Sequence, residues 1–78
     1  MPDNLTEYAR IGYHGNECPH LWSSPAWYAH QLGSYLHATG RPIPTDVRMG
    51  RGQSIRARDL RFTFTHGEGG RVSFERIE

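Results

Sequence analysis

Residues 24–40 read SPAWYAHQLGSYLHATG, a stretch that carries both a helix start and a helix stop. Ser24 is suited to accept a hydrogen bond from the unpaired amides of a first helical turn. Pro25 fits the first helical position, because the amide that it lacks would have no partner there. Gly40 favours the left-handed conformation that ends a helix, and Pro42 prevents continuation. We therefore predict a helix over residues 25–39.

This predicted helix is amphipathic. Ala29, Leu32 and Leu36 share one face at helical spacing, so that face is expected to cover a sheet. Gly33 costs about 1 kcal/mol relative to Ala inside a helix. We interpret it as a point where another backbone approaches closely.

The second half of the chain alternates in the way that β-strands do. Apolar residues at 47, 49, 55 and 57 alternate with arginines around a turn at 50–53, which predicts a hairpin with one apolar and one arginine face. A clearer hairpin is expected over residues 60–77. Its predicted register pairs Phe64 with Val72, Phe62 with Phe74, Arg61 with Glu75 and Thr63 with Ser73. The inward positions change from odd to even numbers between the two hairpins, so we predict a bulge or bend at Arg58-Asp59.

The N-terminal segment, residues 5–13, has two readings. Ala9, Ile11 and Tyr13 alternate with their neighbours, which slightly favours a strand. The alternative is a short helix capped by Asp3 and ended by Gly12.

The fold class expected from these elements is α+β. A chain of 78 residues forms one domain, spanning residues 1–78. The main helix, at about 25–39, would pack on an antiparallel sheet of three to five strands that ends in the hairpin 60–77. A core this thin leaves little room for a catalytic cleft, so we expect a binding or regulatory module and no enzyme.

Charge is unevenly distributed along the chain. All nine basic residues are arginine, and residues 41–61 carry six of them against two aspartates. Arginine forks suit phosphate contact, and the amides of Gly50 and Gly52 could approach an anion. We predict that an arginine-rich sheet face binds nucleic acid or another anionic partner, such as an acidic protein surface; its residues are Arg48, Arg51, Arg56, Arg58 and Arg61. A solvated face with internal ion pairs is the simpler interpretation.

A second hypothesis is a protein-interaction or inhibitor module. If the core takes one face of the predicted helix, Trp27 is left partly exposed on another, where an aromatic residue can anchor a partner. That face carries Trp27, His30, Ser34 and His37. Homodimerisation through it, or through an open sheet edge, is a further expectation. Packing of Trp27 on the N-terminal segment is the competing interpretation.

A third hypothesis is a small structural zinc protein. His14, Cys18 and His20 offer zinc-binding donors, but their spacing matches no recognised site, so no metal or cofactor is expected. A single cysteine excludes an intrachain disulfide. No leader or transmembrane run is visible, so we expect no membrane association and a cytoplasmic location, in a bacterium or from a phage.

Overall fold

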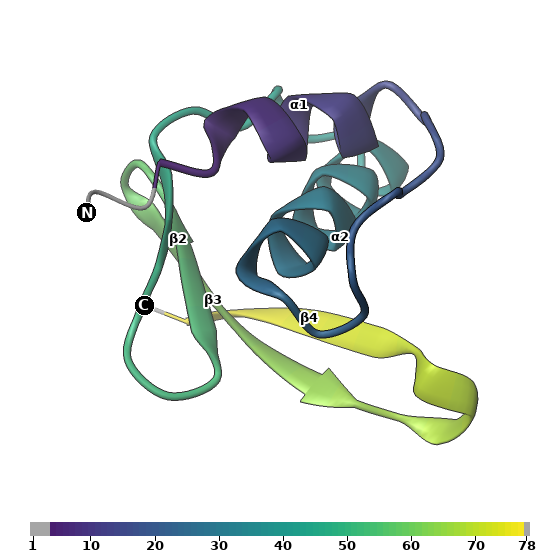
Figure 1. Cartoon of the computed structure of the whole chain (residues 1–78). Coiled ribbons are helices and arrows are strands. Elements are labelled where there is room, and N and C mark those ends of the chain that lie inside the picture. Colours follow the sequence, from purple (N-terminus) through teal and green to yellow (C-terminus); the bar gives the residue numbers. More distant parts are fainter. Residues whose placement is uncertain (1–3, 78) are drawn as a thin grey trace.

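The computed structural model describes residues 4–77 and has an α+β fold, as predicted. Two helices lie on one face of a four-stranded antiparallel sheet with strand order β1-β2-β3-β4 (Figure 1). The elements are α1 (Thr6–Tyr13), α2 (Pro25–Ala38), β1 (Val47–Met49), β2 (Ser54–Ala57), β3 (Leu60–His66), a 3₁₀ turn η1 (Glu68–Gly70) and β4 (Val72–Ile77).

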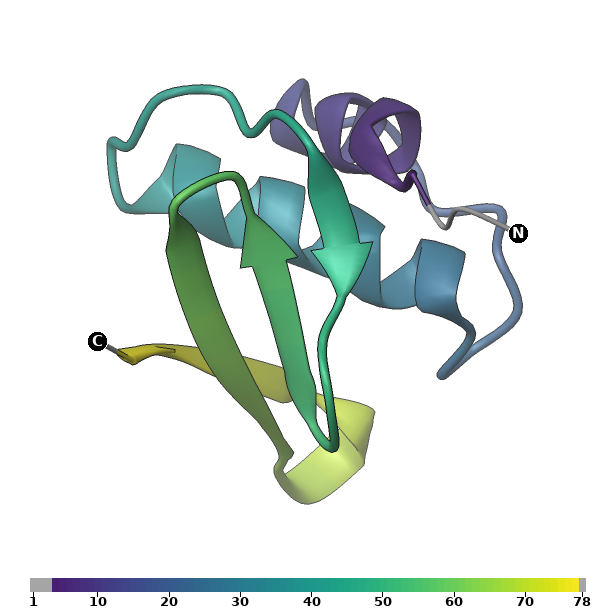
Figure 2. The same ribbon diagram turned by 90° about the vertical axis from the view of Figure 1, so that its left-hand side faces the viewer.

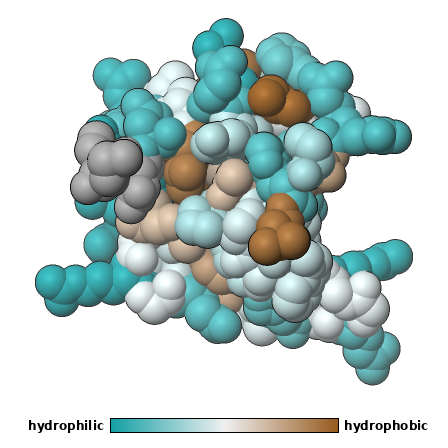
Figure 3. Space-filling view, viewed as in Figure 1, coloured by the Kyte–Doolittle hydropathy of each residue, from teal (hydrophilic) through white to brown (hydrophobic). Residues whose placement is uncertain are grey.

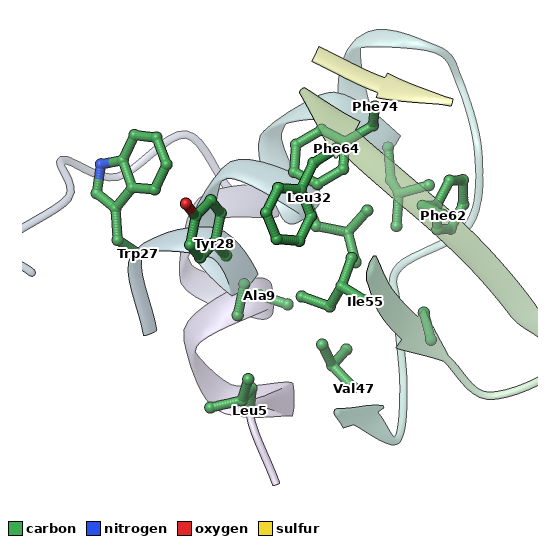
Figure 4. Close-up of a cluster of buried hydrophobic side chains, with 13 residues drawn as sticks. Leu5, Ala9, Trp27, Tyr28, Leu32, Val47, Ile55, Phe62, Phe64 and Phe74 are labelled. Carbon is green, nitrogen blue, oxygen red and sulfur yellow. The ribbon is translucent and has the colours of Figure 1, made fainter. Parts of the chain in front are cut away.

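Helix α2 begins and ends as the sequence predicts. The side-chain oxygen of Ser24 accepts a hydrogen bond from the Trp27 amide at 3.2 Å, and Pro25 is the first helical residue. Gly40 has φ of 73° just beyond the last turn. Ala29, Leu32 and Leu36 are fully or almost fully buried, and the aromatic ring of Tyr28 stacks on Phe64 of the sheet (Figure 4).

The preference for a strand over residues 5–13 is wrong, because this segment forms α1. Leu5 and Ala9, one helical turn apart, are buried in the common core. Gly12 lies inside this helix rather than ending it, and Asp3 lies outside the described residues. Local alternation was a weaker determinant here than burial of a helical face against α2.

The two helices cross closely at small residues. A methyl group added at Gly33 would overlap the carbonyl oxygen of Ala9, and one added at Gly12 would overlap that of His30. The hydroxyl of Ser34 donates to the Gly12 carbonyl at 3.1 Å across the crossing. The close backbone approach predicted at Gly33 is therefore confirmed.

The prediction of a bulge or bend at Arg58-Asp59 has the right position, but a bulge within one continuing strand is wrong, because the chain reverses direction there. Ala57 pairs with Leu60 across a two-residue turn whose first residue, Arg58, has φ of 58°. Paired residues share a sheet face, so Ala57 and Leu60 face inward although one number is odd and the other even. The tight turn explains the change of parity.

The register of the C-terminal hairpin differs by two residues from the prediction. Phe64 pairs with Phe74, Thr63 with Glu75, and Arg61 with Ile77. The loop begins one residue later than expected, at Gly67, whose amide donates to the Arg71 carbonyl at 2.7 Å. His66 therefore stays in β3, where its Nε2 lies 2.5 Å from the Tyr28 hydroxyl. A shift of two residues keeps every side chain on its predicted face.

Candidate anion-binding site

Three arginines lie side by side on the outer face of the sheet, away from the helices. Arg48 of β1 is directly opposite Arg56 of β2, and Arg56 is directly opposite Arg61 of β3. Their neighbours along the strands, including Val47, Ile55 and Phe62, are buried on the other face. Figure 2 views these three strands with α2 behind them, so the arginine row lies on the side toward the viewer.

The Arg56–Arg61 pair has the closer of the two antiparallel geometries. The Phe64 amide donates to the carbonyl of Gln53, so alternation directs the backbone groups of Phe62 toward β2 and those of Arg61 away from it. Arg56 and Arg61 thus form a non-hydrogen-bonded pair, in which opposed Cα atoms are about 4.5 Å apart. Like charges placed directly opposite each other in this way destabilise a sheet.

A groove of about 800 Å³ opens on this face. Three of its lining residues are arginines (Arg51, Arg56 and Arg61). The polar remainder offers hydroxyl or amide groups, from Gln53, Ser54, Thr63 and Thr65. No aspartate, glutamate, histidine or cysteine lines the groove in the described part of the chain. The Ser54 hydroxyl already donates to the Arg51 carbonyl at 2.6 Å, and the Thr63 hydroxyl to the Glu75 carbonyl at 3.4 Å. The groove therefore presents to a ligand the cationic forks, with Gln53 and Thr65 as further donors.

The groove arginines lack a counter-charge among the residues that the structure describes. Within residues 4–77, Arg51, Arg56 and Arg61 form no ion pair with a carboxylate. Arg48 does, since its Nε lies 2.8 Å from Asp46 at an exposed position. The expected pairing of Arg61 with Glu75 does not occur, because Glu75 is opposite Thr63.

Two details of the predicted arginine face are wrong. Arg58 does not share the face, because it occupies the β2–β3 turn beside a separate, smaller cavity. The amide of Gly50 is not free for an anion, since it donates to the Ser54 carbonyl at 3.0 Å. Arg51, on the turn after Gly50, does line the groove as expected.

The threonines of β3 and Ser54 of β2 complete the groove, and the sequence interpretation did not include them. Thr63 and Thr65 alternate with the inward-facing Phe62 and Phe64, so they lie on the same outer face as Arg61. This alternation was the signal in the sequence that could have identified them.

The helix face proposed for a partner is covered by the chain itself. Trp27 is 9% exposed, which overturns its expected exposure, and it packs against the ring of Trp22. His30 is buried, with its Nε2 2.9 Å from the Asn16 carbonyl. Ser34 contacts α1, so only His37 of the four residues is exposed, beside Tyr13. The cover consists of α1 and the loop that follows it.

The predicted zinc ligands do not assemble. Across residues 4–77, His14, Cys18 and His20 form no cluster that could hold a metal ion. The His20 ring instead packs edge-on against Tyr8, with ring centroids 4.8 Å apart. Cys18 is half-buried against the core.

Neither helix in the described residues is long and apolar enough to cross a membrane. The face of the molecule seen in Figure 3 is mostly hydrophilic, with separated hydrophobic side chains. Comparison of the chain with protein-family models, with curated proteins and with solved structures finds no match.

Proposed function

We propose that this chain is a small non-enzymatic binding module whose outer sheet face contacts the phosphate backbone of a nucleic acid. The observation that carries the proposal is the groove itself: three arginines that have no carboxylate partner among residues 4–77, two on the sheet and one on the adjoining turn, beside hydroxyl and amide side chains. Arg48 extends the positive row at one end.

The chemistry of the groove favours phosphate over bases. Guanidinium forks make paired, charge-assisted hydrogen bonds to phosphate oxygens, and the Gln53 amide and the Thr65 hydroxyl add further donors. The aromatic rings of β3, Phe62 and Phe64, belong to the buried core. Bases would thus find no stacking platform in the groove, whereas single-strand binding modules provide one. The expected binding is sensitive to salt and largely indifferent to sequence.

Catalysis is not part of the proposal. A general base within reach of a reacting group would be needed to activate a groove hydroxyl such as that of Ser54. The groove residues are arginines, hydroxyls, an amide and apolar side chains, none of which is suited to that role at neutral pH.

The test is binding of fluorescently labelled duplex DNA and RNA at several salt concentrations. Each phosphate contact contributes about −0.9 to the slope of log affinity against log salt. Replacing Arg56 or Arg61 by Ala should weaken binding to all sequences alike and reduce the magnitude of the slope by roughly one.

The matched control is Arg10→Ala. Arg10 is exposed on α1 and makes a surface ion pair with Glu7, so this variant removes the same charge from outside the groove. Its slope should equal that of the unaltered protein. Equal losses of nucleic-acid affinity in the Arg10 and Arg56 variants, or no binding of nucleic acid at low salt, would refute the proposal. Binding of an acidic protein without binding of nucleic acid would identify that protein class as the partner.

A further inference from the structure

The two edge strands of the sheet differ in whether another segment of the chain covers their outer backbone groups. At the β1 edge, the Val47 carbonyl accepts from the Leu5 amide at 2.7 Å, and the Val47 amide donates to the Thr6 hydroxyl at 3.0 Å. The start of α1 therefore occupies that edge. Within residues 4–77, no strand pairs with the outer edge of β4, which is twice as long as β1.

The groups exposed at the β4 edge follow from the hydrogen-bond pattern. Since Phe64 directs its amide toward β2, its neighbours Thr63 and Thr65 direct theirs toward β4. Their partners Glu75 and Ser73 face β3 in return. The amides and carbonyls of Val72 and Phe74 consequently point outward, in the arrangement that accepts another strand.

We propose that a second copy of this chain pairs its β4 antiparallel to this edge, forming a two-fold symmetric dimer with one continuous sheet. Centring the pairing on Ser73 places Val72 of each copy opposite Phe74 of the other, so the outward backbone groups meet. The same register places Arg71 opposite Glu75 twice. Two apolar contacts and two ion pairs thus result from one register.

Neighbouring registers are worse. Centring on Val72 would set Arg71 opposite Ser73 and Glu75 opposite Gly69, so neither Arg71–Glu75 ion pair would form. Centring on Phe74 would set Val72 opposite the charged Arg76 and leave Glu75 opposite Ser73. Centring on Glu75 would put the two identical carboxylates together, which is destabilising. Charge complementarity therefore selects the register centred on Ser73 and selects a second copy as the occupant.

The symmetry has a consequence for the groove. Directly opposed residues of paired strands lie on the same face, so the outer faces of both copies lie on one side of the joined sheet. The two β3 strands would be three strand spacings apart, about 14 Å. If the proposed function holds, two arginine clusters would then act on one nucleic acid, with a gain in avidity.

The experiment measures mass by sedimentation over a hundredfold range of protein concentration, without nucleic acid, so it is independent of the proposed function. Mass should rise from the 8.9 kDa of one chain toward twice that value. Arg71→Glu and Glu75→Arg should each raise the dissociation constant about tenfold or more, because like charges then face each other twice. The double variant should restore dimerisation. Arg10→Glu, with the same charge change on α1, should not alter it.

Hydrogen exchange provides a second readout. The amides of Val72 and Phe74 should exchange more slowly as concentration rises, whereas the amide of Gly67, bonded within its own loop, should not change. A mass of one chain throughout the range would overturn the proposal. So would a folded double variant that stays monomeric, because the register would then be wrong.

Discussion

Replacing Gly33 by Ala should destabilise this protein, although helix propensity alone predicts the opposite. In an ordinary helix interior the substitution gains about 1 kcal/mol. Here the added methyl would lie 2.8 Å from the carbonyl carbon of Ala9 and from the amide nitrogen of Tyr13, and it would overlap the Ala9 oxygen. Ordinary contact begins near 3.4 Å, so relief of the two 2.8 Å contacts alone would need 0.6 Å, and the overlap with the oxygen requires a larger separation of α1 and α2.

The obstruction consists of backbone atoms, which cannot rotate away as a side chain can. Overpacking of a well-packed core costs about 1–3 kcal/mol, and a rigid obstacle places Gly33→Ala near the upper end. After the gain in propensity, the net loss is about 2 kcal/mol. For a domain of this size each kcal/mol shifts Tm by about 4–8 °C, so Tm should fall by roughly 8–16 °C.

Thermal unfolding followed by circular dichroism measures this change, and Gly67→Ala is the matched control. Gly67 has an extended backbone, and an added methyl there meets only the Arg71 oxygen, at 3.9 Å. The control should be neutral or stabilising by about 0.4–1 kcal/mol, since Ala restricts the unfolded chain. A Gly33→Ala variant that is as stable as the control would show that the helix crossing is not tight.

Two further substitutions test local features. Ser24→Ala removes the cap that accepts from the Trp27 amide, so it should cost about 1 kcal/mol in urea unfolding; an unchanged midpoint would show that the cap contributes nothing. Arg58→Gly should stabilise, because a left-handed residue with a Cβ costs about 1–2 kcal/mol and the extra entropy of Gly returns only about 0.5–1 kcal/mol. It should leave nucleic-acid affinity almost unchanged, since Arg58 lies outside the groove, and a large loss of affinity would contradict that placement.

The elements that the sequence predicts well are those specified by neighbouring residues. Helix α2 has its start at Ser24-Pro25 and its stop at Gly40 within one stretch, and both hairpins follow from strict alternation. Helix α1 differs, because its cause is not local. Residues 5–13 suit either a strand or a helix, and the choice depends on the fit of Ala9 and Gly12 to α2.

In the candidate site, too, some features are specified by neighbouring residues and others depend on tertiary packing. Alternation along β2 and β3 predicts that Arg56 and Arg61 share a face with Thr63. It does not specify which carboxylate lies opposite, because that depends on whether the loop begins at His66 or Gly67. The burial of Trp27 could not be predicted from the sequence either. The loop and the helix that cover this side chain take positions that depend on the whole core.

The arginine row is the point at which the sequence of this sheet departs from what the fold requires. Two residues further along the strands, Ser54 is opposite Thr63 and Thr63 is opposite Glu75, pairs in which no two like charges meet. The adjacent positions place Arg56 opposite Arg61 in the closer pair geometry and Arg48 opposite Arg56 on the other side. Threonine would satisfy the sheet at each of them and would favour a strand more than arginine does. Arg48 is compensated by Asp46, so the repulsion that lowers stability in the free protein falls mainly on Arg56 and Arg61, and an anionic ligand that bridges these two would remove it.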